Sequence, residues 1–336
     1  MIRRSEAIKV IIVLVLMAAA VLLVRQAALG GRAKDNAGKE RTLPEVERVQ
    51  PYTIINGQKC QVRPNLESLL VIGTDRTGPL TDIEDKDTEE TMRSDTLLLL
   101  VVNKQEDTYG IITINRNTML NVRSLTKEGE VEGISEVQAS FAYAGGYTRE
   151  QSCENAAWSV SDFLYGFPVD HSVAFSISAI GVLNHAAGGV EVKINDDFSK
   201  ADKSLKKGQT VKLTDEQADA FVHGRMSVGD GTNENRMSRQ EQFMAAWGKQ
   251  MRKQYKDNAD EAAKVFDELG DLMYTDMLKG DLSRFLKAYL SDKDLGIYEI
   301  DGEIGEDAFF KWATFTADEK SKEQIAMEML FEPYEE

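Results

Sequence analysis

The sequence predicts an α/β protein of three-layer α/β/α type, in which a central mixed sheet is preceded by one N-terminal transmembrane helix. Three observations support this prediction. Apolar runs of strand length interleave with helical segments, which is typical of a sheet covered by helices on both faces. Two of these runs are separated by only a short polar turn, so at least one strand pair is antiparallel. One longer apolar stretch lies close to the N-terminus.

Residues 7–24 are expected to anchor the protein in the membrane. Val10–Val24 is an unbroken apolar run, and only Lys9 interrupts its extension toward the N-terminus. A helix over 7–24 spans about 27 Å, which is close to the hydrocarbon core of a bilayer. A cleaved signal peptide is the alternative, because the apolar core is short and small residues follow it. Both interpretations export the remainder; the anchor would leave 1–6 in the cytoplasm and make the polar residues 25–50 a tether.

Strand-like runs dominate the first part of the exported region. Asn56-Gly57 lies between two such runs within residues 52–62, and this dipeptide is a strong signal for a type I′ hairpin. Residues 68–75 form an apolar run that ends in Gly-Thr-Asp. Two more buried strands are predicted at 96–103 and 109–116, and the short turn between them predicts a second hairpin.

Two capping boxes mark helix starts. Thr148 with Gln151 and Thr214 with Gln217 each match the capping-box pattern, so a helix is expected to begin at each threonine. Periodicity and stop signals predict the remaining elements. These are strands near 171–175, 190–194 and 297–300, and helices over 149–165, 177–186, 215–223, from 233 past 247, and 321–330.

Composition limits the classes of function. The net charge of −16 makes the protein a poor candidate for binding a nucleic-acid backbone, and two Cys with three His are too few for a closed zinc site. Export permits one disulfide, for which Cys60 and Cys153 are the only candidates; two buried free thiols are the alternative. We expect the main exported domain over 51–255 and a helical C-terminal extension over 256–336 that packs onto it.

Four short polar segments follow or precede the predicted elements. They are 73–76, 93–96, 115–118 and 223–240. Strand ends of this kind gather along one rim of a sheet, where α/β proteins bind ligands. Arginine dominates these segments, with Arg76, Arg93, Arg116, Arg225, Arg236 and Arg239.

Arginines gathered at a rim of an acidic protein predict an anion site, because guanidinium groups match phosphate oxygens bidentately. Asp75 and Asp95 would lie beside them, and two carboxylates next to a phosphate group commonly bind Mg²⁺. The alternative interpretation is that the arginines are solvated or paired with acids, and that the aspartates form caps and turns.

The order of these segments resembles the LytR-CpsA-Psr family of bacterial cell-envelope proteins. The matching stretches are LLVIGTDR, RSDTLLLLVVN, NRNTM, FAYAGG at 141–146, the Gly-Gly-Val of HAAGGVEV, and the RxxRQ of Arg236–Gln240. The resemblance covers about residues 66–255, and the predicted single anchor also fits it. The spacing within 148–169 is similar to a clostridial-type branch of the family.

The resemblance implies transfer of a glycopolymer phosphate, of teichoic-acid or capsular type, from a polyprenyl-pyrophosphate carrier to peptidoglycan outside the cytoplasm. It implies Asp75 and Asp95 as ligands of Mg²⁺, or of Mn²⁺ in its place, and catalytic roles for Arg93, Arg116 and Asp95. The implied pyrophosphate contacts are Arg76, Arg93, Arg116, Arg225, Arg236, Arg239 and Gln240. Positioning and charge neutralisation would carry most of such a phosphoryl transfer.

Two departures from the family pattern leave rival functions open. The family usually has an acid where this sequence has Asn117, and often a second arginine where it has His223. A degenerate or specialised paralogue, such as a regulator that holds polyprenyl pyrophosphate without turnover, is therefore one alternative. A pyrophosphatase that acts on the same lipid with water as acceptor is another.

Overall fold

The computed structural model describes most of the protein beyond the predicted tether. The described residues are 51–84, 92–224, 226–231, 233–255, 268–277, 285, 293–308 and 311–335. The predicted anchor at 7–24 and the tether at 25–50 lie outside them. Among the residues described, no helix is both long and apolar enough to cross a membrane.

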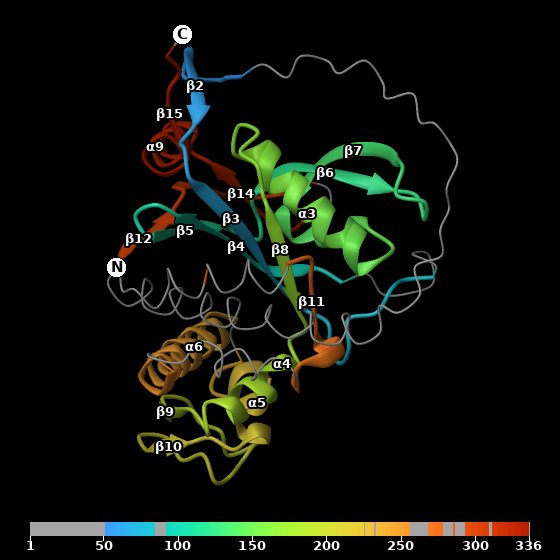
Figure 1. Ribbon diagram of the computed structural model, residues 1–336. Helices are drawn as coiled ribbons and strands as arrows, with labels where there is room; N and C mark the ends of the chain where they lie inside the picture. Colours follow the sequence, from blue (N-terminus) through green and yellow to red (C-terminus); the bar gives the residue numbers. More distant parts are fainter. Residues whose placement is uncertain are drawn as a thin grey trace, which may run out of the picture.

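A six-stranded sheet forms the centre of the molecule, in the order β11-β8-β3-β4-β5-β12 (Figure 1). Its strands are β3 (Leu66–Thr74), β4 (Ser94–Asn103), β5 (Thr108–Ile114), β8 (His171–Phe175), β11 (Met273–Thr275) and β12 (Asp294–Glu299). β4 is antiparallel to both β3 and β5, and β11 is antiparallel to β8. β8 runs parallel to β3, and β12 parallel to β5, so the sheet is mixed, as predicted.

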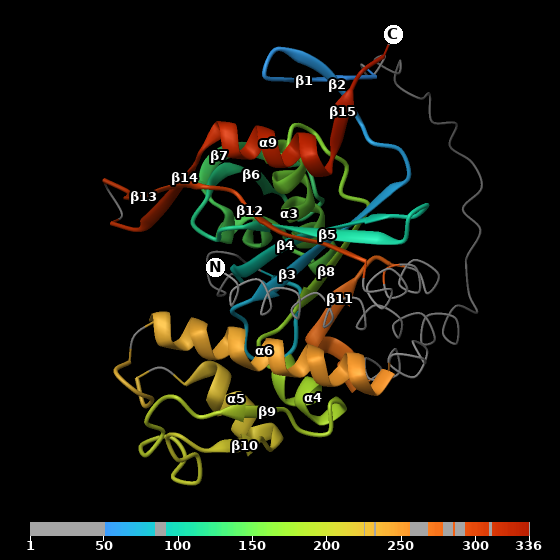
Figure 2. The ribbon, with the colours of Figure 1, turned by 90° about the vertical axis from the view of Figure 1, so that its left-hand side faces the viewer.

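Helices cover both faces of this sheet (Figure 2). They are α3 (Arg149–Phe163) and α9 (Glu319–Met329) on one face, and α4 (Ala179–Ala186), α5 (Asp215–His223) and α6 (Asn233–Tyr255) on the other. Successive strand residues point to opposite faces. Leu69 of β3 therefore joins a core with Trp247 of α6, while Leu70 joins one with Val160 of α3 and Ile325 of α9. Burial on both faces explains the continuous apolar runs of the central strands.

The local signals in the sequence form the structures predicted from them. Both capping boxes are present, at Thr148 with Gln151 and at Thr214 with Gln217. The hairpin of β1 (Thr53–Ile55) and β2 (Gln58–Val62) turns through Asn56 and Gly57, both at positive φ. A type I′ turn requires positive φ at both central positions, which Asn-Gly provides at low cost.

Other antiparallel strand pairs and short helical turns of the described residues lie outside the central sheet. They include β6 (Met119–Leu125) with β7 (Val131–Gln138), β9 (Glu191–Lys193) with β10 (Thr210–Lys212), and the 3₁₀ turns η1 (Ala139–Phe141), η2 (Tyr143–Gly145) and η4 (Gly270–Leu272). Apart from β9, these strands were not predicted from the sequence. β7 is exposed over most of its length and β10 has only three residues, whereas β6 alternates between buried and exposed residues and was missed despite that signal.

The C-terminal residues contribute strands as well as a helix, unlike the helical extension predicted over 256–336. β11 and β12 form the two outer edges of the central sheet. β13 (Gly302–Glu306) pairs with β14 (Ala313–Ala317), and β15 (Phe331–Pro333) pairs with β2. The strand predicted near 297–300 overlaps β12, whereas the three-residue β11 carries too little periodicity to be recognised. The boundary placed at 255 separates both strands from the rest of their sheet.

The predicted disulfide is absent. Cys60 and Cys153 are both buried free thiols. The Cys60 Sγ lies 3.5 Å from the Met327 Sδ of α9, whereas Cys153 lies on α3 and burial raises its pKa well above the ordinary thiol value. Instead of pairing, each sulfur packs in the apolar core as a small hydrophobic group.

Candidate functional site

Three of the four polar segments meet at one rim of the central sheet. Because β3 and β5 both run antiparallel to β4, the end of β3, the start of β4 and the end of β5 lie together. The strand register pairs Thr74 with Ser94 and Leu97 with Ile114. The topology therefore brings together segments 73–76, 93–96 and 115–118, as predicted from the sequence.

Asp75 and Arg93 hold the end of β3 to the start of β4. The Arg93 backbone N–H donates to the Asp75 Oδ1 at 2.8 Å, and the Asp75 N–H donates to the Arg93 carbonyl at 3.0 Å. The register shifts by one residue immediately before this pair, between Gly73 and Thr74. This reciprocal pairing fixes the backbone beneath both side chains and leaves the Arg93 guanidinium to be placed by other contacts.

Asp95 interacts electrostatically with four other charged residues at the rim. Its Oδ1 is 2.6 Å from the Arg116 Nη1, and both side chains are partly exposed. Burial raises the pKa of Asp95, and Arg116 opposes that rise most strongly. The charge of Asp75 raises the pKa further, while Arg236 and Arg93 lower it. Two carboxylates and three guanidinium groups therefore act on one another at this edge; we call these five residues the rim cluster.

The fourth segment reaches the rim cluster through Arg236, near the start of α6. Arg236 also lowers the pKa of His223, although burial is the larger cause of that decrease. The His223 Nδ1 lies 2.7 Å from the Asp219 Oδ1 on the same helix, α5. Arg236 thus lies within electrostatic range of both Asp95 and His223. The predicted contact Arg225 lies outside the described residues.

Arg239 occupies a buried network of its own. It is 3% exposed, and its Nη1 donates to the Asp196 Oδ2 at 2.6 Å. Its Nε donates to the Phe221 carbonyl at 2.8 Å, and its Nη2 donates to the Gly224 carbonyl. The neighbouring Gln240 donates to the Val222 carbonyl at 3.4 Å. These contacts support a role in holding the end of α5, in contrast to the direct pyrophosphate contact predicted for both residues.

Arg76 connects the end of β3 to the end of β8. Its carbonyl accepts hydrogen bonds from the Ser176 Oγ at 2.8 Å and the Ile177 N–H at 3.1 Å. The Nε of Arg76 is buried and has no hydrogen-bond partner within the described part of the protein. Through its backbone, Arg76 therefore joins the ends of two neighbouring strands beside the rim.

Two aromatic residues contact the site, and neither was predicted as a site residue. The Arg93 guanidinium carbon lies 4.5 Å from the centre of the Phe141 ring and 5.9 Å from that of Trp312. Phe141 lies in the FAYAGG stretch, whereas Trp312 belongs to the loop between β13 and β14. No local signal could have joined Trp312 to this rim, because the contact bridges distant parts of the sequence.

The rim carries carboxylates of the kind that Mg²⁺ prefers as ligands. Among the described residues, no group of three or more His, Cys, Asp or Glu is placed to hold a metal ion. Mg²⁺ needs no such cage, since it is commonly held by one or two carboxylates together with substrate phosphates and waters. The charge of Asp75 helps to raise the pKa of Asp95, and a divalent cation would relieve that repulsion. The pair therefore fits a Mg²⁺ ion shared with a phosphate ligand.

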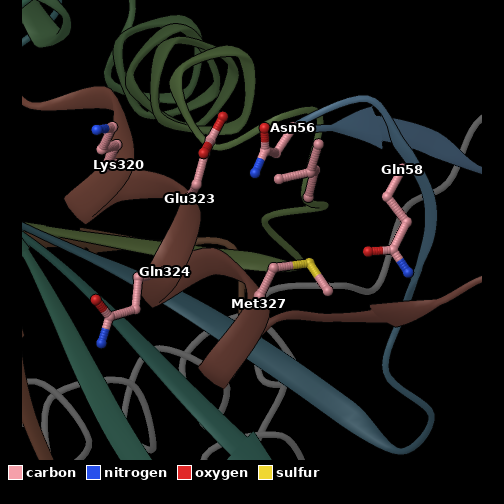
Figure 3. Close-up of a pocket in the computed structure, with 7 residues that line it drawn as sticks. Asn56, Gln58, Lys320, Glu323, Gln324 and Met327 are labelled. Atoms are coloured by element: carbon pink, nitrogen blue, oxygen red, sulfur yellow. The ribbon is translucent and has the colours of Figure 1, made fainter.

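A separate hollow of about 390 Å³ lies between the β1–β2 hairpin and α9 (Figure 3). Asn56, Gln58, Lys320, Glu323 and Met327 line it, together with Ile55 and Gln324. It contains no residue of the four polar segments. This hollow and the rim cluster are therefore different places on the molecule.

Comparison with known structures agrees with this architecture. A structure of protein gbs0355 from Streptococcus agalactiae has a TM-score of 0.58 and 19% identity, over 79% of this protein and 88% of that one. A structure of TagT bound to LIIa-WTA has a TM-score of 0.51 and 20% identity, over 79% and 90% of the two proteins. These likenesses show the same fold.

A named relative and a family of related sequences also match this protein. The polyisoprenyl-teichoic acid–peptidoglycan teichoic acid transferase TagU of Halalkalibacterium halodurans is 24% identical over 225 residues, which is 67% of this protein and 68% of the relative. The LytR_cpsA_psr family matches residues 34–330, which include every part of the rim cluster. The protein therefore belongs to the LytR-CpsA-Psr family.

Proposed function

We propose that this protein transfers a glycopolymer phosphate, of teichoic-acid or capsular type, from a polyprenyl-pyrophosphate carrier to peptidoglycan. The observation that carries the proposal is the rim cluster, in which Asp95 lies within range of a second carboxylate and three arginines. Such a cluster suits a pyrophosphate and its counter-ion. Membership of the family and the name of the teichoic acid transferase relative support this choice of substrate.

The arginines bind and neutralise the pyrophosphate. Arg93, Arg116 and Arg236 converge on the rim from the start of β4, from the end of β5 and from α6. Each guanidinium offers donors in a fixed planar fork that matches phosphate oxygens. As the transfer proceeds, charge grows on the bridging oxygen of the leaving polyprenyl phosphate, and donors already in place stabilise it at little cost in reorganisation.

Asp75 and Asp95 would hold a Mg²⁺ ion, which supplies further positive charge beside the pyrophosphate. The ion pair with Arg116 fixes one oxygen of Asp95, and the Arg93 N–H fixes one oxygen of Asp75. These contacts orient both carboxylates. The three arginines also lower the pKa of Asp95 and so oppose the effects of its burial and of the Asp75 charge.

The reaction is a displacement at the phosphorus next to the sugar. A hydroxyl oxygen of peptidoglycan forms a bond to that phosphorus, its proton is lost to solvent or a base, and the bond to the polyprenyl phosphate breaks. The protein does no covalent work in this scheme. Its contribution is to align the two substrates and to neutralise the phosphates.

Asn117, which stands where the family usually has an acid, is held by hydrogen bonds from two neighbouring segments. The Asn117 Oδ1 accepts a hydrogen bond from the Gln138 Nε2 at 3.2 Å, and its carbonyl accepts one from the Phe315 N–H at 2.8 Å. One contact is made by the Asn117 side chain and the other by its backbone, so Asn117 holds the segment that carries Arg116 against Gln138 and β14.

We also propose that residues 7–24 anchor the protein in the cell membrane as a single span, with the described domain on the outer side. This arrangement would place the rim near a lipid-linked substrate and the peptidoglycan acceptor. Membership of a clostridial-type branch stays a prediction. Mass spectrometry of the membrane fraction tests the anchor: a mature N-terminus beyond residue 24 would show a cleaved signal peptide instead.

The proposal is tested by incubating the protein with a short-chain polyprenyl-pyrophosphate glycan, Mg²⁺ and a muropeptide acceptor. We expect glycan-linked muropeptide and free polyprenyl phosphate in equal amounts. Release that needs no acceptor would identify a lipid pyrophosphatase, and tight binding without release in the presence of acceptor would identify a regulator.

A further inference from the structure

Two aromatic rings cover the guanidinium of Arg93. Its central carbon lies 4.5 Å from the Phe141 ring centre and 5.9 Å from the Trp312 ring centre. The rings themselves are stacked, with centroids 5.5 Å apart and planes 29° from parallel. Phe141 ends η1, and Trp312 lies in the loop of the β13–β14 hairpin, so the three side chains come from three different parts of the fold.

Hydrogen bonds fasten that hairpin to the segment that carries Arg116. The Phe315 N–H of β14 donates to the Asn117 carbonyl at 2.8 Å. The side-chain amide of Gln138 bridges the two elements, because its Nε2 lies 2.6 Å from the Ala313 carbonyl and 3.2 Å from the Asn117 Oδ1. Gln138 is buried, so these bonds are shielded from water. The position of Trp312 is therefore coupled to the rim.

The hairpin contributes little to the apolar core. Every residue of β13 is exposed, and Ile304 on that strand is 83% exposed. Figure 2 shows the hairpin projecting from the body of the molecule. Trp312 itself is 39% exposed, which is unusual for a tryptophan that serves only to fill a core. Its contacts with Phe141 and Arg93 mark the place where the hairpin meets the domain.

We propose that Trp312, together with Phe141, is a positioning residue that holds the plane of the Arg93 guanidinium toward the bound pyrophosphate. A cation above an aromatic face is attracted by the ring, and tryptophan gives the strongest such interaction. Arginine has many rotamers, so a contact that fixes its side chain before binding lowers the entropy lost on binding. The β13–β14 hairpin thereby belongs to the active site.

This inference rests on the proposed function, because it assigns Trp312 to the site through Arg93. The competing interpretation is that Trp312 only covers the edge of the domain. The test uses the full-length protein in detergent, the short-chain polyprenyl-pyrophosphate glycan and the muropeptide acceptor. The variants are Trp312→Ala, Trp312→Phe and, as a matched control, Trp158→Ala, which removes a tryptophan whose ring lies 4.7 Å from the Arg123 guanidinium.

We expect Trp312→Ala to lower kcat/KM about three- to thirtyfold, the range of a cation–π contact, without changing the midpoint of thermal unfolding. Trp312→Phe keeps an aromatic face and should restore most of that loss. Trp158→Ala should leave kcat/KM unchanged. Equal losses in the Trp312→Ala and Trp158→Ala variants, or no rescue by phenylalanine, would overturn the inference.

A double-mutant cycle tests whether Trp312 affects activity through Arg93 or independently of it. In an Arg93→Ala background, adding Trp312→Ala should cost no further activity, because the group that Trp312 positions is already gone. A full additional loss would contradict the inference. If the unmodified protein shows no turnover, the proposed function fails, and the same cycle is then read from the affinity for the polyprenyl-pyrophosphate glycan. Coupling between the two positions in binding would still support the positioning role, and additive effects would overturn it.

Discussion

The Asp95 Oδ1 lies 2.6 Å from the Arg116 Nη1, between the start of β4 and the end of β5. This ion pair joins two polar segments that are separated in sequence by a buried hairpin. It keeps Arg116 at the rim and gives Asp95 the cation that most strongly opposes the effect of its burial. The pair therefore links the fold of the central sheet directly to the charge balance of the site.

Removal of Arg116 should abolish most of the transfer. We expect Arg116→Ala to lower kcat by about 10²–10³-fold, the cost of losing one preorganised donor to developing negative charge. Release of polyprenyl phosphate measures the effect. Arg149→Ala is the matched control, because Arg149 also pairs with an aspartate, Asp82 at 3.5 Å, but lies outside the rim cluster. Similar losses in both variants would contradict the assignment.

The raised pKa of Asp95 predicts a pH dependence of stability. Burial makes the folded state bind this proton more tightly than the unfolded state does, so the free energy of unfolding falls as pH rises above the ordinary value of 3.8. Asp95→Asn removes that contribution. The thermal midpoint of the unmodified protein should therefore fall relative to that of the Asp95→Asn variant as pH rises from about 4. Parallel curves at every pH would argue against a perturbed carboxyl.

His223 should make the stability of the protein depend on pH in the opposite direction. Burial lowers its pKa, and Arg236 adds to the decrease, so the unfolded state binds the proton more tightly. Stability from this source is complete above the ordinary pKa of 6.5 and is lost as pH falls below it. His223→Gln should flatten the decrease in thermal midpoint between about pH 6.5 and pH 5. His185→Gln is the control, because His185 is an exposed histidine that also contacts an aspartate.

The buried network of Arg239 predicts a loss of stability together with a loss of activity. Arg239→Ala leaves Asp196 and two carbonyls without their donor, which should cost about 3–5 kcal/mol of the free energy of unfolding. Asp196→Asn should also lower turnover, although Asp196 belongs to none of the polar segments. Urea unfolding and the transfer assay measure both variants. Normal turnover of Asp196→Asn would indicate that Arg239 acts on the substrate directly.

The strands that form the rim could be predicted because they are buried on both faces. β3, β4 and β5 appear as continuous apolar runs, and the polar residues beside them mark their ends. The capping boxes at Thr148 and Thr214 were equally visible, since each depends on residues only three positions apart. Local signals of this kind are contained within one segment of sequence.

Long-range features could not be predicted in the same way. The edge strands β11 and β12 are short and come from the C-terminal part, so only tertiary packing identifies them as members of the sheet. The contact of Trp312 with Arg93 likewise depends on a hairpin that docks from far along the sequence. The pairing expected for Cys60 and Cys153 was wrong because a count of cysteines says nothing about their distance in the fold.

The joint dependence of turnover on Mg²⁺, Arg116 and Asp75 is the decisive measurement. The full-length protein is incubated with a short-chain polyprenyl-pyrophosphate glycan and a muropeptide acceptor, with Mg²⁺ or with excess chelator, beside Arg116→Ala and Asp75→Ala. We predict release of polyprenyl phosphate and formation of glycan-linked muropeptide only in the unmodified protein with the metal. Equal turnover in Asp75→Ala, or turnover that survives the chelator, would contradict the proposed metal site. Neither binding nor turnover of this lipid would contradict the proposed function itself.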